Sequence, residues 1–298
     1  MHIKGLIAAP FTPMNQDFSI NLHAIEKLAQ YYHEQPLAGI FINGTTGEGM
    51  SLSVEERIEL ANQWIKYAKD DFKIIVHVGH TCLNDCRILA SHAQEIRADA
   101  ISTMATSFFK WAKVDDLVEF CSQIAVQVPD LPFYYYHMPS MTGAHFKMIN
   151  FLEVACDWIP NLAGIKFTHE NLMDYRNCLN FQNNRFDMLF GRDEILLAGL
   201  SLGASGAVGS TYNYASPLYT KLMRAFEAGD VATARRLQDI SIELITAFAS
   251  TNCSEIAANK YVMQYYSGID LGPARLPLTN LTDIQKKNLR FELDKIIF

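Results

Sequence analysis

Positive charge, long apolar runs and paired cysteine motifs are all scarce in this sequence. Its 25 Lys and Arg against 32 Asp and Glu give a net charge of −7, which disfavours nucleic acid or an anionic membrane as a partner. The apolar start is broken by Pro10 and Pro13, and the uncharged stretch 195–220 is rich in Gly and Ser, so neither an export signal nor a membrane span is expected. Six scattered cysteines without a CxxC motif are typical of reduced thiols in a cytoplasmic protein.

Hydrophobic residues make up 49% of the 298 positions, so the chain can bury a large core. Length leaves the domain count open, because a domain takes about 150 residues whereas an α/β barrel takes about 250. Short apolar runs rich in β-formers alternate with amphipathic segments. The eight predicted strands are 5–13, 38–44, 73–79, 100–108, 132–137, 162–168, 186–191 and 204–210.

This alternation predicts parallel strands joined by helical crossovers, and eight such units close a barrel. A doubly wound sheet is the alternative, but no GxGxxG motif follows the first strand. After residue 210 the pattern is helical only, with helices predicted over 217–228, 231–249, 254–266 and 282–297. We therefore predict an α/β fold: a (β/α)8 TIM barrel over residues 1–228, with a C-terminal helical extension over 229–298 that packs on the barrel and is not an independent domain.

Lys166 is the most informative residue, because it lies in the otherwise apolar strand 162–168. Parallel barrels place their reacting groups at the C-terminal ends of strands, where the following loops form the concave face. Burial favours an uncharged amine, which is the form that attacks a carbonyl to make a Schiff base. The alternative is a strand-end lysine that pairs with a carboxylate, and spacing alone does not separate the two.

Two other predicted strands end in groups that fit carboxylate binding and proton transfer. The Gly-Thr-Thr-Gly-Glu loop at 44–48 offers backbone N–H groups and the hydroxyls of Thr45 and Thr46 to a carboxylate, or is simply a tight connection. Tyr136 shares one face of its strand with Tyr134. Its hydroxyl can relay a proton, or it is a packed aromatic side chain.

Other polar clusters are less specific. Asp193 and Glu194 can contact substrate hydroxyls or cap the next helix. His77, His80 and Cys82 resemble a metal cluster, but strand alternation sends the two histidines to opposite faces, so we predict no metal site. No GxSxG or HExxH motif supports a hydrolase or a metalloprotease.

Four ordered motifs, spread over nearly the whole chain, together resemble the N-acetylneuraminate lyase and dihydrodipicolinate synthase family of class I pyruvate aldolases. They are Gly-Thr-Thr-Gly-Glu at 44–48, Tyr-x-x-Pro at 136–139 followed by Thr142-Gly143, Gly-Ile-Lys at 164–166, and Gly-x-Asp-Glu at 191–194. The resemblance implies a (β/α)8 barrel in a homotetramer that needs no metal or organic cofactor.

The same resemblance implies roles for individual residues. Lys166 would form a Schiff base with pyruvate, Tyr136 would transfer protons, and Thr45 and Thr46 would hold the pyruvate carboxylate. Positions where the lyases contact a polyhydroxylated sugar chain are occupied here by Thr168, Gly191, Asp193, Glu194 and Ser210.

Two departures from the synthase pattern favour the lyase branch. An arginine that binds a second carboxylate in the synthases is replaced by Met141, and a tyrosine that completes a proton relay with a neighbouring subunit is replaced by Phe109. The implied activity is cleavage of N-acetylneuraminate (sialic acid) to N-acetylmannosamine and pyruvate in the cytoplasm. The alternatives are a 2-keto-3-deoxy sugar-acid aldolase, dihydrodipicolinate synthase, or a non-catalytic barrel that binds a keto acid.

Overall fold

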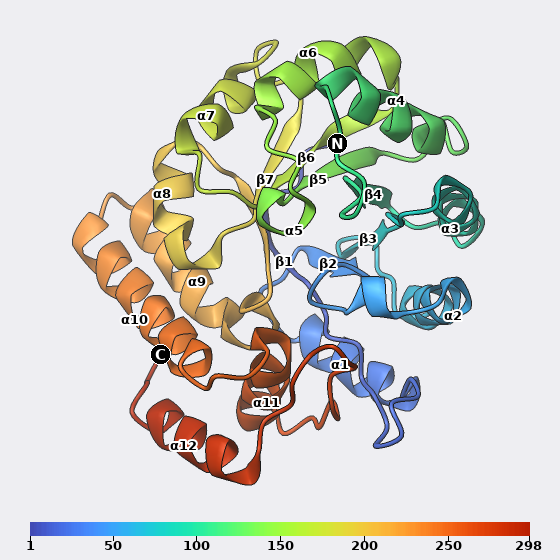
Figure 1. The fold of residues 1–298 in the computed structure, drawn as a ribbon. Coiled ribbons are helices and arrows are strands. Elements are labelled where there is room, and N and C mark those ends of the chain that lie inside the picture. The colour runs from blue at the N-terminus through green and yellow to red at the C-terminus, as the bar shows by residue number, and fades with distance from the viewer.

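The computed structural model describes all 298 residues, and eight parallel strands form a closed barrel in chain order (Figure 1). The strands are β1 Gly5–Ala8, β2 Gly39–Ile42, β3 Lys73–His77, β4 Ala100–Met104, β5 Phe133–His137, β6 Leu162–Phe167, β7 Asp187–Phe190 and β8 Gly206–Gly209. Because β1 pairs with both β2 and β8, the sheet has no free edge. The predicted barrel is confirmed. Several strands end before their predicted ends, since loop residues were counted into them.

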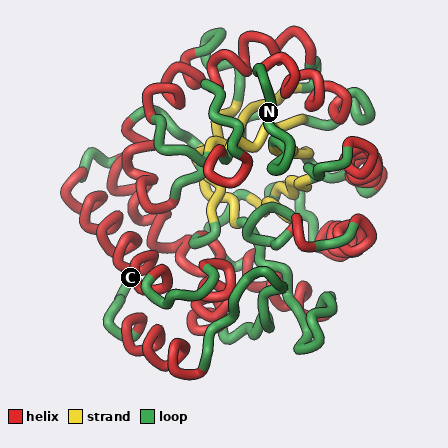
Figure 2. The backbone as a smooth tube through the Cα atoms, in the orientation of Figure 1, coloured by secondary structure: helices red, strands yellow, loops and turns green.

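Helices surround the strands, as the red tube around the yellow strands shows (Figure 2). Those that follow successive strands are α1 His23–His33, α2 Val54–Ile65, α3 Leu83–Glu95, α4 Val114–Ala125, α6 Met148–Trp158, α7 Leu172–Asn180, α8 Leu196–Ser201 and α9 Tyr212–Glu227. Short turns lie in the loops after β2, β5 and β7: η1 Gly49–Ser51, α5 Pro139–Thr142 and η2 Asp193–Ile195. None of the helices combines the length and the apolar character that a membrane-spanning segment needs.

Local sequence signals explain where helices begin. The side chain of Ser53 accepts a hydrogen bond from the backbone N–H of Glu56, and the carboxylate of Glu56 accepts one from the backbone N–H of Ser53. This capping box starts α2 at the position that the sequence predicts. A second capping box, between Thr282 and Gln285, starts α12 (Asp283–Leu293).

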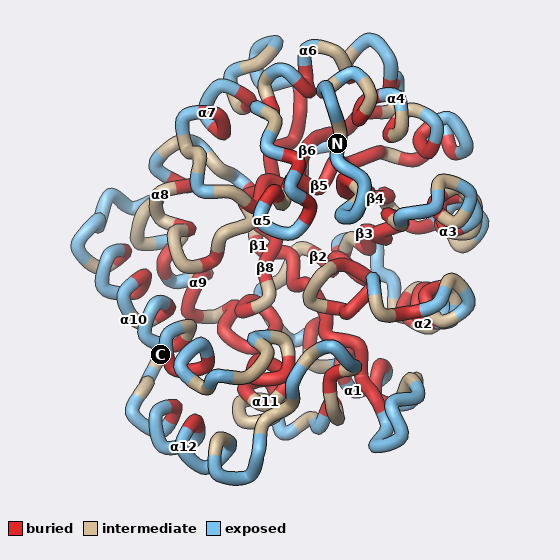
Figure 3. Tube along the Cα trace, in the orientation of Figure 1, coloured by how far each residue is buried: buried red, intermediate tan, exposed pale blue.

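Strand alternation divides the buried residues into two clusters. Tyr134 and Tyr136 belong to the smaller cluster together with Phe41, Ile75 and other side chains inside the barrel. Tyr135 belongs to the larger cluster, where side chains of the strands and the helices meet. Figure 3 shows the buried backbone concentrated along the strands and the inner sides of the helices. The predicted shared face of Tyr134 and Tyr136 is therefore confirmed, and it points into the barrel.

Three helices follow the barrel and lie together against one side of it: α10 Val231–Ala249, α11 Glu255–Ser267 and α12 (Figure 1). Helix α10 packs along α9 and reaches η2, whereas α11 contacts both α9 and α10. Leu244, Val262 and Leu289 from these helices belong to the same apolar cluster as the outer faces of the strands. The extension therefore shares the core of the barrel.

A buried ion pair joins this extension to the loop after β2. Nζ of Lys260 on α11 lies 2.6 Å from Oε1 of Glu48, and it donates a hydrogen bond to the backbone oxygen of Pro273 at 2.8 Å. Oε2 of Glu48 accepts a hydrogen bond from the backbone N–H of Arg275. Burial lowers the pKa of Lys260, and the neighbouring Glu48 carboxylate opposes that shift. Each charge is thus compensated mainly by the other.

We expect Lys260→Met to lower the free energy of unfolding by about 3–5 kcal/mol, because it leaves the Glu48 carboxylate buried without a cation. Denaturant unfolding of the wild type and the variant measures this change. The exposed Lys286 of α12 supplies the control, and Lys286→Met should change stability by less than about 0.5 kcal/mol. Equal losses in the two variants would show that the buried pair is not specifically stabilising.

Candidate active site

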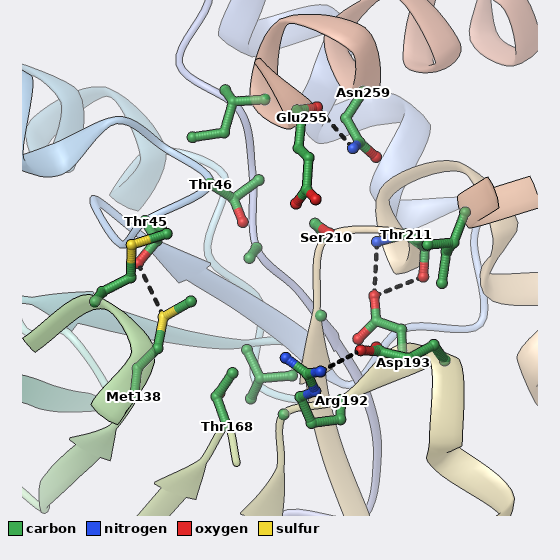
Figure 4. Close-up of a pocket in the computed structure, with 18 of the residues that line it drawn as sticks. Thr45, Thr46, Met138, Thr168, Arg192, Asp193, Ser210, Thr211, Glu255 and Asn259 are labelled. Atoms are coloured by element: carbon green, nitrogen blue, oxygen red, sulfur yellow. Dashed lines mark hydrogen bonds and ion pairs between the residues drawn. The ribbon is translucent and has the colours of Figure 1, made fainter. Parts of the chain in front are cut away.

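A cavity of about 450 Å³ opens at the C-terminal ends of the strands, next to α11 (Figure 4). The loops after β2, β5, β6, β7 and β8 bring together in its wall all the residues proposed from the sequence. These are Thr45, Thr46, Tyr136, Lys166, Thr168, Gly191, Asp193, Glu194 and Ser210. Barrel closure produces this convergence, because parallel strands end at one face.

Lys166 projects from β6 into the base of the cavity and is 4% exposed. Its Nζ lies 3.9 Å from the ring centre of Tyr136 and 4.2 Å from that of Phe41. No carboxylate lies within ion-pairing distance of this amine. The alternative of a strand-end lysine paired with an acid is therefore wrong. Contacts with two ring faces hold the amine and leave its nitrogen free to bond to a carbon atom.

Tyr136 on β5 meets the loop after β2. Its hydroxyl lies 3.2 Å from Oγ1 of Thr45 and donates a hydrogen bond to Sδ of Met138 at 3.1 Å. The aromatic pair Phe108 and Phe109 lies outside the cavity and is 77% and 80% exposed. Within this chain the proton partner nearest to Tyr136 is therefore the Thr45 hydroxyl.

Histidine 77 lies inside the barrel, and its ring is 5.9 Å from that of Phe41 and 5.8 Å from that of Tyr136. Burial lowers the pKa of His77 well below its ordinary value, and the cations of Arg57 and Lys166 lower it further. The ring is therefore neutral. His80 instead accepts a hydrogen bond from its neighbour Cys82 in a surface loop, so the two histidines do not share a site.

Asp193 is held by the loop after β8. Its Oδ2 accepts hydrogen bonds from the backbone N–H of Thr211 at 2.9 Å and from the Thr211 hydroxyl at 2.6 Å. Burial raises the pKa of Asp193 to about 6, against the opposing effect of the Thr211 hydrogen bonds. A Cβ at Gly209 would lie only 1.8 Å from Oδ1, so this position requires glycine. Asp193 therefore orders two loops as well as lining the cavity.

Glu194 has a different environment, since it is partly exposed and pairs with Arg192 at 2.8 Å. Arg192 also pairs with Glu170, so both carboxylates share one guanidinium group. Thr168 is 8% exposed, and its hydroxyl has no partner within the protein. A Cβ at Gly191 would lie 2.0 Å from that hydroxyl oxygen, so glycine at this position keeps the Thr168 hydroxyl in place.

Reasoning from strand ends misses the part of the wall that lies on or beside the helical extension. Helices α10 and α11 and the turn between them contribute Ile245, Phe248, Ser254, Glu255, Ile256 and Asn259 to the cavity. These residues lie far along the chain in an amphipathic pattern that signals only packing. Arg192 directly follows a predicted strand, so its position could have identified it.

Comparisons with known proteins give consistent results. A family model described as the dihydrodipicolinate synthetase family matches residues 2–296. N-acetylneuraminate lyase A of Xenopus laevis is 46% identical over 278 residues, which are 93% of this chain and 90% of that protein. The human N-acetylneuraminate lyase is 42% identical over 281 residues, 93% of this chain and 87% of that protein. The structure of Proteus mirabilis N-acetylneuraminate lyase covers 100% of both chains with a TM-score of 0.96 and 38% identity.

We expect Asp193→Asn to change how stability depends on pH. The pKa of Asp193 is about 6 in the folded protein and 3.8 ordinarily, so between these values only the folded protein keeps the proton. Wild-type stability therefore falls as pH rises through this window, by about 3 kcal/mol in total. Asparagine has no such term, so denaturant unfolding at several pH values should show a smaller loss in the variant. Parallel pH dependences would contradict the assignment.

Proposed function

This chain belongs to the dihydrodipicolinate synthetase family, and we propose that it is a lyase that cleaves N-acetylneuraminate to N-acetylmannosamine and pyruvate. The observation that carries the proposal is the buried Lys166 amine, unpaired with any carboxylate and in contact with the Tyr136 ring at the base of a polar cavity. The curated relatives named N-acetylneuraminate lyase support the choice of substrate.

In the proposed reaction, Lys166 supplies the nucleophile. Its nitrogen attacks the C2 carbonyl of the open-chain 2-oxo acid, and loss of water gives a protonated imine. The imine withdraws electrons as the C3–C4 bond breaks, while the proton of the C4 hydroxyl passes to Tyr136 and the aldehyde carbon of N-acetylmannosamine forms. The remaining enamine takes a proton at C3 from Tyr136. Water then hydrolyses the imine, which releases pyruvate and restores the amine.

The loop after β2 would bind the carboxylate of the substrate. Thr45 and Thr46 line the cavity on the side of Tyr136, and Thr12 stabilises the loop by donating a hydrogen bond to the backbone oxygen of Gly47 at 2.6 Å. Hydroxyl and backbone N–H groups of such a loop suit a carboxylate. Proximity of Thr45 to Tyr136 places the substrate carboxylate near the group that transfers protons.

The opposite side of the cavity would bind the hydroxylated chain of the sugar. Thr168, Asp193, Glu194 and Ser210 present hydroxyl and carboxylate groups there, beside Gly191. Met141, where the synthases carry an arginine, lines the cavity without a charge. A substrate with a second carboxylate would therefore lack the cation that binds it in the synthases.

We further propose that the enzyme is a cytoplasmic homotetramer. Phe108 and Phe109 contact each other edge to face at 5.1 Å on the surface, where burial against another subunit would remove apolar area from water. All six cysteines are free thiols, as is typical of a reducing compartment.

Pyruvate release from N-acetylneuraminate tests the proposal directly. We expect wild type to release pyruvate and Lys166→Ala to retain less than about 1% of that rate, because the nucleophile is lost. Borohydride reduction in the presence of pyruvate should give a covalent adduct on wild type only. The exposed Lys113, which lies outside the cavity, is the control, and Lys113→Ala should match wild type in both assays. Substantial turnover by folded Lys166→Ala would overturn the Schiff-base mechanism.

Tyr136→Phe should lower kcat by roughly 100-fold or more, since it removes the group that transfers protons but keeps the ring against Lys166. Tyr135 on the same strand provides a matched control, because its side chain packs outside the barrel. Tyr135→Phe should leave kcat within about two-fold of wild type. An unchanged rate in Tyr136→Phe would assign the proton transfer to the substrate carboxylate or to water.

A further inference from the structure

The first turn of α11 carries a carboxylate, Glu255, that no cation in the protein neutralises. The side chain of Glu255 lines the cavity, and Figure 4 shows it directed into the space that Thr46 and Ser210 also border. Only its backbone oxygen accepts a hydrogen bond, from Nδ2 of Asn259 at 2.8 Å. An ionised carboxylate is purely an acceptor, so Glu255 offers two unoccupied acceptor oxygens to a ligand.

Buried contacts on two sides fix the helix turn that carries Glu255. Tyr214 on α9 donates a hydrogen bond to Oδ1 of Asn259 at 2.5 Å, which connects α11 to the helix that follows β8. One residue further on, Lys260 pairs with Glu48 and connects α11 to the loop after β2. The backbone of Glu255 is therefore held in place over the cavity, and a side chain on a fixed support suits selective recognition.

The charges along the cavity are arranged unequally. Two cations line it, Lys166 at the base and Arg192 in the wall, and Arg192 is already paired with Glu170 and Glu194. Asp193 and Glu194 occupy the same wall as Arg192, whereas Glu255 enters from α11. The base can thus attract a carboxylate, while the part lined by these acids favours neutral or hydrogen-bond-donating groups.

We propose that Glu255 is a specificity-determining residue that accepts hydrogen bonds from hydroxyl groups at the end of the substrate remote from the Schiff base. This inference rests on the proposed function. A 2-oxo acid attached to Lys166 directs its hydroxylated chain away from the base, and hydroxyls that leave water need acceptors. Hydrogen bonds to a carboxylate are charge-assisted and stronger than neutral ones. A chain ending in a second carboxylate is disfavoured by Glu255 through like-charge repulsion.

The two products separate the ends of the site, and so they test the proposal. Pyruvate occupies only the base, whereas N-acetylmannosamine is the hydroxylated part. We expect Glu255→Gln to raise KM for N-acetylneuraminate by about 5-fold and Glu255→Ala by about 10-fold, with kcat within about two-fold of wild type. The inhibition constant of N-acetylmannosamine should rise by the same factors, while that of pyruvate should not change.

Glu243 on α10 is the matched control, since it is exposed and lies outside the cavity. Glu243→Gln should leave every constant unchanged. If the constants for both products change equally in Glu255→Gln, the residue acts through the structure of the site and the proposal is wrong. Unchanged constants for both products would also overturn it. If wild type releases no pyruvate from N-acetylneuraminate, the proposed function itself fails, and this inference fails with it.

Discussion

The amine of Lys166 lies inside a closed barrel between two aromatic rings, and no carboxylate neutralises it. Barrel closure creates this environment, because inward-facing side chains must pack against one another while the strand ends remain open to the cavity. The contacts of the amine with Phe41 and Tyr136 are worth about 2 kcal/mol at most, and they set its direction rather than its charge balance. The arrangement of the other groups in the cavity follows from this position, since each is placed by the end of a neighbouring strand.

The helical extension completes the site that the barrel begins. The buried pair of Glu48 and Lys260 connects the loop after β2 to α11, and the hydrogen bond between Tyr214 and Asn259 connects α11 to α9. Two loops that would bind opposite ends of a substrate are therefore held by the same helix. Stability and binding are coupled here, because a buried ion pair is costly to break and lies one loop away from the proposed carboxylate site.

Rigid polar contacts distinguish the two carboxylates that follow β7. Asp193 is enclosed by Thr211 and Gly209, and burial raises its pKa to about 6. Glu194 stays partly exposed and shares Arg192 with Glu170. Adjacent residues thus have different physical roles, with Asp193 ordering loops and Glu194 remaining accessible to a ligand. This difference depends on neighbours that are distant in the sequence.

The sequence by itself determined the eight-fold alternation, the capping box at Ser53, and the strand-end positions of Lys166 and Tyr136, because these signals are local in the chain. It left open whether Lys166 was paired with an acid, since pairing depends on residues from other strands. Only the tertiary structure decided that question, and only it brought Glu255 into the cavity. An amphipathic helix records in its sequence which face is buried, but not which distant loop that helix will pack against.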